Sequence, residues 1–116
     1  MLSCGTYRET THGYKIKGDS KIIFNGNDTS LNGKSVISGY IYSRSLESFT
    51  EFGKLLVNQR EHTVNQDGYF NIIVNPGTYE IIAKNLGDNE EKLKRVKLDQ
   101  NTKIIILFEL GTTAIY

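Results

Sequence analysis

Residues 65–79 combine polar turns with alternating apolar runs, and this segment constrains the fold more than any other part of the chain. Its sequence is NQDGYFNIIVNPGTY. The turn at residues 65–68 precedes a run that begins at Phe70, and the turn at residues 75–77 precedes a run that begins at Tyr79. A period of two is typical of half-buried strands, and Asn, Asp, Pro and Gly favour reversals. The segment therefore predicts two strands joined by tight turns, as in a β-sandwich.

The turn residues in this segment also make a specific backbone prediction. Pro76 fixes φ and Gly77 accepts a positive φ, so this pair fits a type II turn, while Asp67 and Gly68 supply the other reversal. Phe70 and the first aromatic residue after Gly77, Tyr79, each follow their turn by two residues and are expected in the core. The tyrosine hydroxyl needs a partner, which predicts a place near the sandwich edge.

Similar alternation elsewhere brings the total to about seven strands in a single domain of residues 21–116. The other five runs are residues 35–43, 55–57, 61–64, 93–98 and 103–110. Gly39 inside its run predicts the close approach of another element or a bulge. Residues 21–24 are a short additional candidate strand, residues 44–54 are expected to be a loop, and residues 1–20 are expected to be a flexible tether.

Composition limits the classes of partner. The chain has 116 residues, with 14 Lys and Arg against 13 Asp and Glu, which gives a formal net charge of +1. This balance offers no electrostatic reason to expect nucleic acid, because binding to nucleic acid depends on neutralising phosphates. The longest apolar run, residues 104–108, has strand length and is too short to span a bilayer.

Residues 35–110 resemble the carboxypeptidase regulatory-like domain family, within the transthyretin-like (prealbumin-like) group of sandwiches. The resemblance lies in the Gly39 strand, in VNQDGYFNI at residues 64–72 and in PGTYEI at residues 76–81. It implies a prealbumin-like, antiparallel Greek-key β-sandwich. It also implies a non-catalytic accessory module of the bacterial cell envelope, in the outer membrane or periplasm of Bacteroidetes-type bacteria, with no cofactor.

Cys4 is the only cysteine, so neither an internal disulfide nor a multi-cysteine metal site can form. The sequence Met1-Leu2-Ser3-Cys4-Gly5 resembles the end of a bacterial lipoprotein signal, in which a small residue precedes the lipid-bearing cysteine. This reading requires a chain trimmed from a longer precursor. It makes Cys4 a candidate lipid-attachment site and the only expected link to a membrane. The alternative is an ordinary free cysteine.

The residues that could support catalysis or metal binding are few. His62, between Glu61 and Thr63, could serve as a general base in a small hydrolase, but it also fits a strand histidine on a partly solvated face. An iron site of the kind built from two histidines would need His12 as well. The acidic run at residues 88–91 could contribute oxygen ligands to calcium, but it lacks the spacing of a ligand-rich loop and is expected to be a solvated turn. We therefore expect no catalytic residues and no metal.

Two sets of outward-facing residues are candidates for binding. Tyr40, Tyr42 and Tyr69 alternate with the expected core residues and could stack on sugars, although tyrosine also covers many sheet surfaces. A second apolar set lies on the parity opposite to the core and is predicted to form an interface. Its members are Ile73, Ile82, Ile105 and Leu107.

An apolar second face of a sandwich requires a cover. The candidates are residues 21–24 of this chain and another chain, which would be a protein partner or a second copy. Three functions are thus expected in order: a non-catalytic envelope module that binds a protein or has a structural role, a carbohydrate-binding module, and a small hydrolase.

Overall fold

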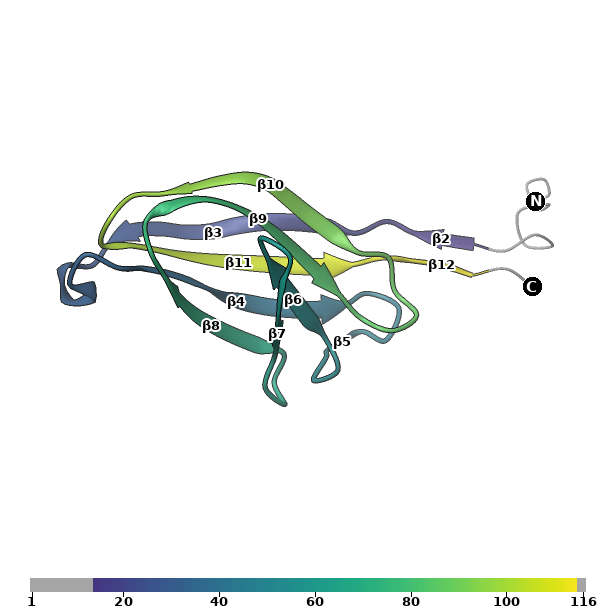
Figure 1. The fold of residues 1–116 in the computed structure, drawn as a ribbon. Helices are drawn as coiled ribbons and strands as arrows, with labels where there is room; N and C mark the ends of the chain where they lie inside the picture. The colour runs from purple at the N-terminus through teal and green to yellow at the C-terminus, as the bar shows by residue number, and fades with distance from the viewer. Residues whose placement is uncertain (1–13, 115–116) are drawn as a thin grey trace.

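The computed structural model describes residues 14–114, which form two β-sheets packed face to face and a two-stranded ribbon (Figure 1). The strand order β3 (Asp19–Asn27), β11 (Thr102–Leu110), β4 (Ser35–Ser43) defines the five-stranded sheet, and β5 (Ser48–Phe49) and β8 (Tyr69–Val74) also pair with β4. The four-stranded sheet has the order β10 (Glu91–Leu98), β9 (Gly77–Lys84), β6 (Lys54–Val57), β7 (Arg60–Thr63). The ribbon pairs β2 (Tyr14–Ile16) with β12 (Thr112–Ala114), and a short 3-10 helix, η1 (Thr29–Leu31), follows β3.

The predicted all-β sandwich is confirmed, and its core follows the predicted alternation. Every second residue of β11, from Ile104 to Leu110, is buried, as are Ile37 and Ile41 of β4. The four-stranded sheet contributes the facing side chains Leu55, Val57, Ile81, Ala83, Val96 and Leu98. Burying one such aliphatic side chain stabilises the fold by about 1.5–3 kcal/mol, so this layer is the main source of stability.

All seven predicted strands are present, but one pairing differs from the antiparallel arrangement expected. β4 and β11 run parallel, with Gly39 opposite Ile106. The prediction that Gly39 marks a close approach is confirmed, because a Cβ on Gly39 would lie 1.9 Å from the carbonyl oxygen of Ile106. Parallel strands cannot be joined by a tight turn, which is why β4 and β11 come from distant parts of the chain.

The two strands of residues 65–79 lie in different sheets. β8 belongs to the five-stranded sheet, whereas β7 before it and β9 after it belong to the four-stranded sheet. Both turns therefore carry the chain across the sandwich: the two predicted strands are present and joined by a short turn, but they do not pair with each other. Gly77 has no positive φ and is already the first residue of β9, so the type II turn at Pro76 is wrong.

The first turn of the segment behaves as predicted. Gly68 has φ +74, and a Cβ there would lie 2.8 Å from the carbonyl oxygen of Ile41. The Asn65 side chain accepts hydrogen bonds from the backbone N–H groups of Asp67 and Tyr69, at 2.9 and 3.0 Å. Phe70 is buried in the core as expected, and the half-buried Tyr79 donates its hydroxyl hydrogen to the Asn75 carbonyl at the sandwich edge.

The N-terminal region contains more strand residues than the sequence pattern predicted. β2 and β3 occupy part of the predicted tether, and residues 1–13 lie outside the described part. β3 pairs antiparallel with β11 and extends the five-stranded sheet at its edge. The hypothesis that residues 21–24 cover a sheet face is therefore wrong. The open hydrogen-bonding edge of β11 explains the result, since backbone groups there need partners.

Candidate functional site

The outer face of the five-stranded sheet, turned away from the core, carries the three tyrosines singled out from the sequence. Alternation along β4 sends Ile37 and Ile41 inward, so Tyr40 and Tyr42 point outward. On the neighbouring strand β8, Tyr69 lies directly opposite Tyr40. Three residues that are separated by up to 29 positions (69 − 40) thus gather on one surface.

Phe49 joins these tyrosines into one aromatic cluster, defined here as Tyr40, Tyr42, Phe49 and Tyr69. The Tyr40 ring centre lies 5.2 Å from that of Tyr69 and 5.6 Å from that of Phe49. Tyr42 and Phe49 are 5.1 Å apart. The two pairs with Phe49 have ring planes that cross at 61° and 74°, the edge-to-face geometry that aromatic side chains prefer, and the Tyr40–Tyr69 pair is tilted at 52°. The rings therefore stabilise one another and do not form a flat platform.

Phe49 was missed by sequence reasoning, which placed it in a loop. Its spacing from Leu46 resembled a helical turn, and β5 is only two residues long. The sequence signal that could have found it is the short spacing between Tyr42 and Phe49, because aromatic residues often lie opposite one another on neighbouring strands, as these two do here.

Aliphatic side chains continue the aromatic cluster across the sheet. Leu107 lies beside Tyr40 on the neighbouring strand β11, and Ile105 lies two residues earlier on the same face. Both are half-buried. Ile73 on β8 is 68% exposed, and Phe24 on β3, opposite Ile105, is 48% exposed. Apolar side chains from every strand of the sheet thus lie on this face, interrupted by polar residues such as the exposed Lys21 and Asn71.

The four residues predicted to form one interface are divided between opposite sides of the molecule. Ile73, Ile105 and Leu107 lie on the outer face of the five-stranded sheet. Ile82 lies on β9 in the other sheet, paired with Leu56 and Lys92. Strand parity distinguishes inside from outside but does not reveal which sheet a strand joins, so Ile82 was grouped wrongly.

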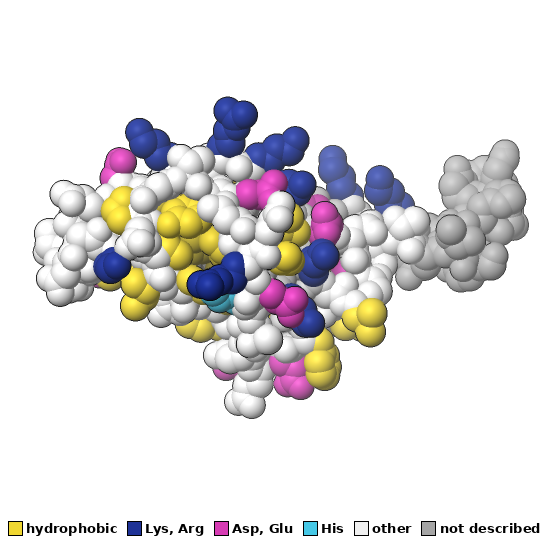
Figure 2. All heavy atoms as spheres, in the orientation of Figure 1, with side chains coloured by type: hydrophobic (Ala, Val, Ile, Leu, Met, Phe, Trp, Pro, Cys, Tyr) yellow, Lys and Arg dark blue, Asp and Glu magenta, His cyan; other side chains and the backbone are white. Residues whose placement is uncertain are grey.

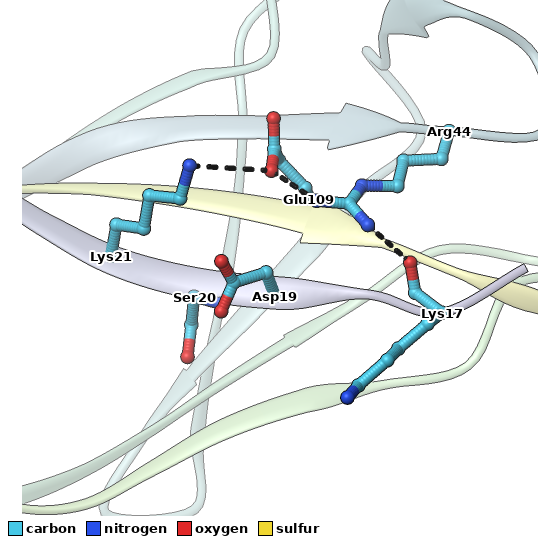
Figure 3. A network of polar contacts seen from close by, with 6 residues as sticks. All are labelled: Lys17, Asp19, Ser20, Lys21, Arg44 and Glu109. Carbon is cyan, nitrogen blue, oxygen red and sulfur yellow. Dashed lines mark hydrogen bonds and ion pairs between the residues drawn. The ribbon is translucent and has the colours of Figure 1, made fainter.

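Charged side chains border this outer face at the end where β4 stops. Glu109 accepts a hydrogen bond from Arg44 at 2.5 Å and lies 4.0 Å from the ammonium of Lys21 (Figure 3). Arg44 also donates to the backbone carbonyl of Lys17, which ties the base of the ribbon to β4. The hydrogen bond to Glu109 raises the pKa of Arg44 above its ordinary value.

A half-buried carboxylate lies near this charged border. Desolvation raises the pKa of Glu91, the first residue of β10, and the nearby Asp19 carboxylate adds to that rise. The positive charges of Arg44 and Lys17 oppose it but do not cancel it. Glu91 is therefore a place where the fold holds a carboxylate at some cost in stability.

The other side of the molecule carries charged side chains along one sheet edge. Figure 2 looks onto the side that includes β9 and β10, where basic side chains line the upper edge along β10. The exposed basic residues of that strand are Lys92, Lys94, Arg95 and Lys97. Partial ion pairing occurs there, since Lys92 lies 3.8 Å from Glu80. Charge rather than apolar surface thus protects this sheet edge.

Asp88 and Glu90 of the acidic run line an open cavity of about 420 Å³, together with the exposed Phe52 and Leu86. Asp88 accepts hydrogen bonds from Ser45 and Asn85, at 3.0 and 2.8 Å, so its oxygens are used locally. Within residues 14–114, no group of three or more His, Cys, Asp or Glu side chains is arranged to hold a metal ion. Cys4 and His12 lie outside the described residues.

His62 lines a second cavity, of about 330 Å³, at the side of the sandwich between β7 and β8. Arg60 and Lys34 share this lining with it. The residues that line the cavity include no Ser, Thr, Cys, Asp or Glu, so the usual nucleophiles and carboxylate partners of a histidine base are not at hand there.

Comparisons with models of known protein families and with curated proteins gave no match to this chain. No helix in the described part is long and apolar enough to cross a membrane.

Proposed function

We propose that this chain is a non-catalytic interaction module that binds a protein surface through the outer face of its five-stranded sheet. The single observation that supports this is the group of apolar side chains on this face, which includes Phe24, Leu107, Tyr40 and Ile73 from four different strands. Exposed apolar side chains gathered on one sheet face are typical of protein interfaces, because leaving them in water is unfavourable.

The chemistry of this face favours a protein over a sugar. Sugar rings stack on broad, flat aromatic faces, whereas the rings of Tyr40 and Tyr69 are tilted by 52° and pack against each other. The aliphatic residues Ile105, Leu107 and Ile73 add surface that suits apolar side chains of a partner. Carbohydrate binding through Tyr40, Tyr42 and Tyr69 is the alternative function, and the proximity of the three rings supports it.

Photo-crosslinking in the native host tests this proposal. A photoreactive phenylalanine analogue replaces Phe24 on the proposed surface or Lys92 on the opposite sheet. We expect a discrete protein adduct from position 24 and none from position 92, and loss of that adduct when Tyr40→Lys is added. Equal adducts from both positions, or none from position 24, would overturn the proposal.

Two further measurements distinguish between the possible binding partners of this surface. Sedimentation of the purified chain separates a second copy of itself from a different protein. A glycan array tests the alternative: binding that is lost in Tyr40→Ala and Tyr69→Ala would replace protein recognition by carbohydrate recognition.

The cellular setting is a separate part of the proposal. We place the module in the bacterial cell envelope, with Cys4 as its lipid-attachment residue and family membership among the carboxypeptidase regulatory-like domains. Support comes from the sequence around Cys4 and from the motifs at residues 64–72 and 76–81. Labelling with radioactive palmitate in the native host checks it, since a Cys4→Ser chain should lose the label. Equal labelling of both chains would remove Cys4 as the attachment site.

A further inference from the structure

The cavity beside His62 lies where the two sheets come together at their free edges. β7 is the last strand of the four-stranded sheet, and β8 pairs only with β4 in the other sheet. Each therefore has one edge whose backbone N–H and C=O groups have no strand partner among the described residues. Residues of both strands line the cavity, so it forms an open groove between two unpaired strand edges.

The rim of this groove is cationic. Lys34, Arg60 and His62 line it, and no carboxylate does. The Lys34 ammonium donates a hydrogen bond to the Asn75 side chain at 2.6 Å, which holds it at the groove while leaving its charge uncompensated. Arg60 is exposed and has no side-chain hydrogen bond or ion pair within residues 14–114. The neighbouring carboxylate, Glu61, is bound instead to Lys54, at 2.9 Å.

The floor of the groove is apolar. Val57 is buried, and Ile72, Val74 and Tyr79 pack against the hydrophobic core while also lining the groove. A simple inorganic anion would use the rim charges but would leave this floor in water. An extended chain with acidic and apolar side chains in alternation could use both, because neighbouring side chains of a strand point to opposite sides.

We propose that this groove binds an extended acidic peptide segment, which adds to the free edge of β8 or β7 and pairs its carboxylates with Arg60 and Lys34. Strand addition supplies affinity through main-chain hydrogen bonds, and the cationic rim selects acidic sequences. The groove adjoins the outer face of the five-stranded sheet at Ile73, which lines both, but its cations and its strand edges are not part of that face. It does not depend on the function proposed for that face.

A peptide titration of the ¹⁵N-labelled full chain tests the proposal by amide shifts. The probe is an acetylated, amidated hexapeptide that alternates Glu and Val, and the matched control peptide carries Gln in place of each Glu. We expect saturable shifts at residues 60–63 and 72–75 with the acidic peptide and at least about tenfold weaker binding of the Gln peptide. Raising NaCl from about 50 mM to about 500 mM should weaken the acidic complex through screening.

Two variants separate this groove from the basic surface in general. Arg60→Gln removes a rim cation and should weaken the acidic peptide about tenfold, whereas Lys97→Gln removes an exposed cation on β10 and should leave affinity unchanged. A dispersed spectrum verifies the fold of each. Equal affinity for both peptides, shifts centred on β10, no saturation, or equally strong shifts at the same amides with inorganic phosphate would overturn the proposal.

Discussion

Gly39 of β4 packs directly against the backbone of Ile106 on the parallel strand β11. A Cβ at position 39 would lie 1.9 Å from the Ile106 carbonyl oxygen, and Gly39 itself has φ +155. The two strands can pair over their full length only because this side chain is missing. The contact joins the strand that carries Tyr40 to the strand that carries Leu107, so it also sets the spacing of the candidate binding face.

Gly39→Ala should therefore destabilise the protein strongly. The added methyl group collides with backbone, which cannot rotate away as a side chain can, and we expect the free energy of unfolding to fall by about 3 kcal/mol. Urea denaturation measures it. Gly33→Ala is the matched control, because Gly33 also has a positive φ but nothing lies within 4 Å of its would-be Cβ. A loss no larger than that of Gly33→Ala would contradict the role given to Gly39.

Phe108 offers a test of the core itself. It is fully buried, and its ring centre lies 6.3 Å from that of Phe70, the predicted core residue of β8. Phe108→Ala should lower the free energy of unfolding by about 4 kcal/mol, because it removes buried apolar area and leaves a cavity. Phe52→Ala, at a residue that is 74% exposed, should change stability by less than about 0.5 kcal/mol. Similar losses in the two variants would mean that the core lies elsewhere.

Strand positions and side-chain directions could be predicted from this sequence because both depend on local patterns. The inward placement of Phe70 and Ile81 and the outward placement of Tyr40 all follow from a period of two. Gly39 marked a close approach and Gly68 marked a turn correctly, since glycine is favoured at both.

The assignment of strands to sheets could not be predicted in the same way. A turn such as Asn75-Pro76 reverses the chain, but whether the next strand pairs with the previous one or crosses the core depends on distant partners. That ambiguity produced the wrong grouping of Ile82 with Ile73. The length of β3 was underestimated for a related reason, since only residues 21–24 were predicted as a strand. Its exposure follows no clean alternation, because it is an edge strand with a register shift near Ile23.

The aromatic cluster makes a prediction about coupling. Tyr40 and Tyr69 lie opposite each other with ring centres 5.2 Å apart, so each residue stabilises the other. A double-mutant cycle with Tyr40→Ala and Tyr69→Ala should give an interaction free energy of about 0.5–1.5 kcal/mol from urea denaturation. Tyr40 with Tyr79, which lies in the other sheet, should give a coupling near zero. Additive losses for the first pair would contradict the packing described.

Glu91 makes the last prediction, on the dependence of stability on pH. Burial raises the pKa of this carboxyl in the folded protein, so the folded state binds a proton more readily than the unfolded state does. The free energy of unfolding should therefore fall as pH rises from the unfolded pKa through the raised folded pKa. Glu91→Gln removes this penalty, because the amide carries no charge to desolvate.

The variant should thus be more stable than the natural chain at neutral pH, and its advantage should shrink when the pH is lowered below the unfolded pKa of Glu91. Thermal unfolding at about pH 7 and about pH 3.5 measures the difference on either side of that transition. Glu51→Gln, at an exposed position, serves as the matched control for losing one carboxylate. If Glu91→Gln destabilised the protein at neutral pH, the attraction of Glu91 to the charges of Arg44 and Lys17 would have to outweigh the cost of its burial, opposite to the direction of its pKa shift.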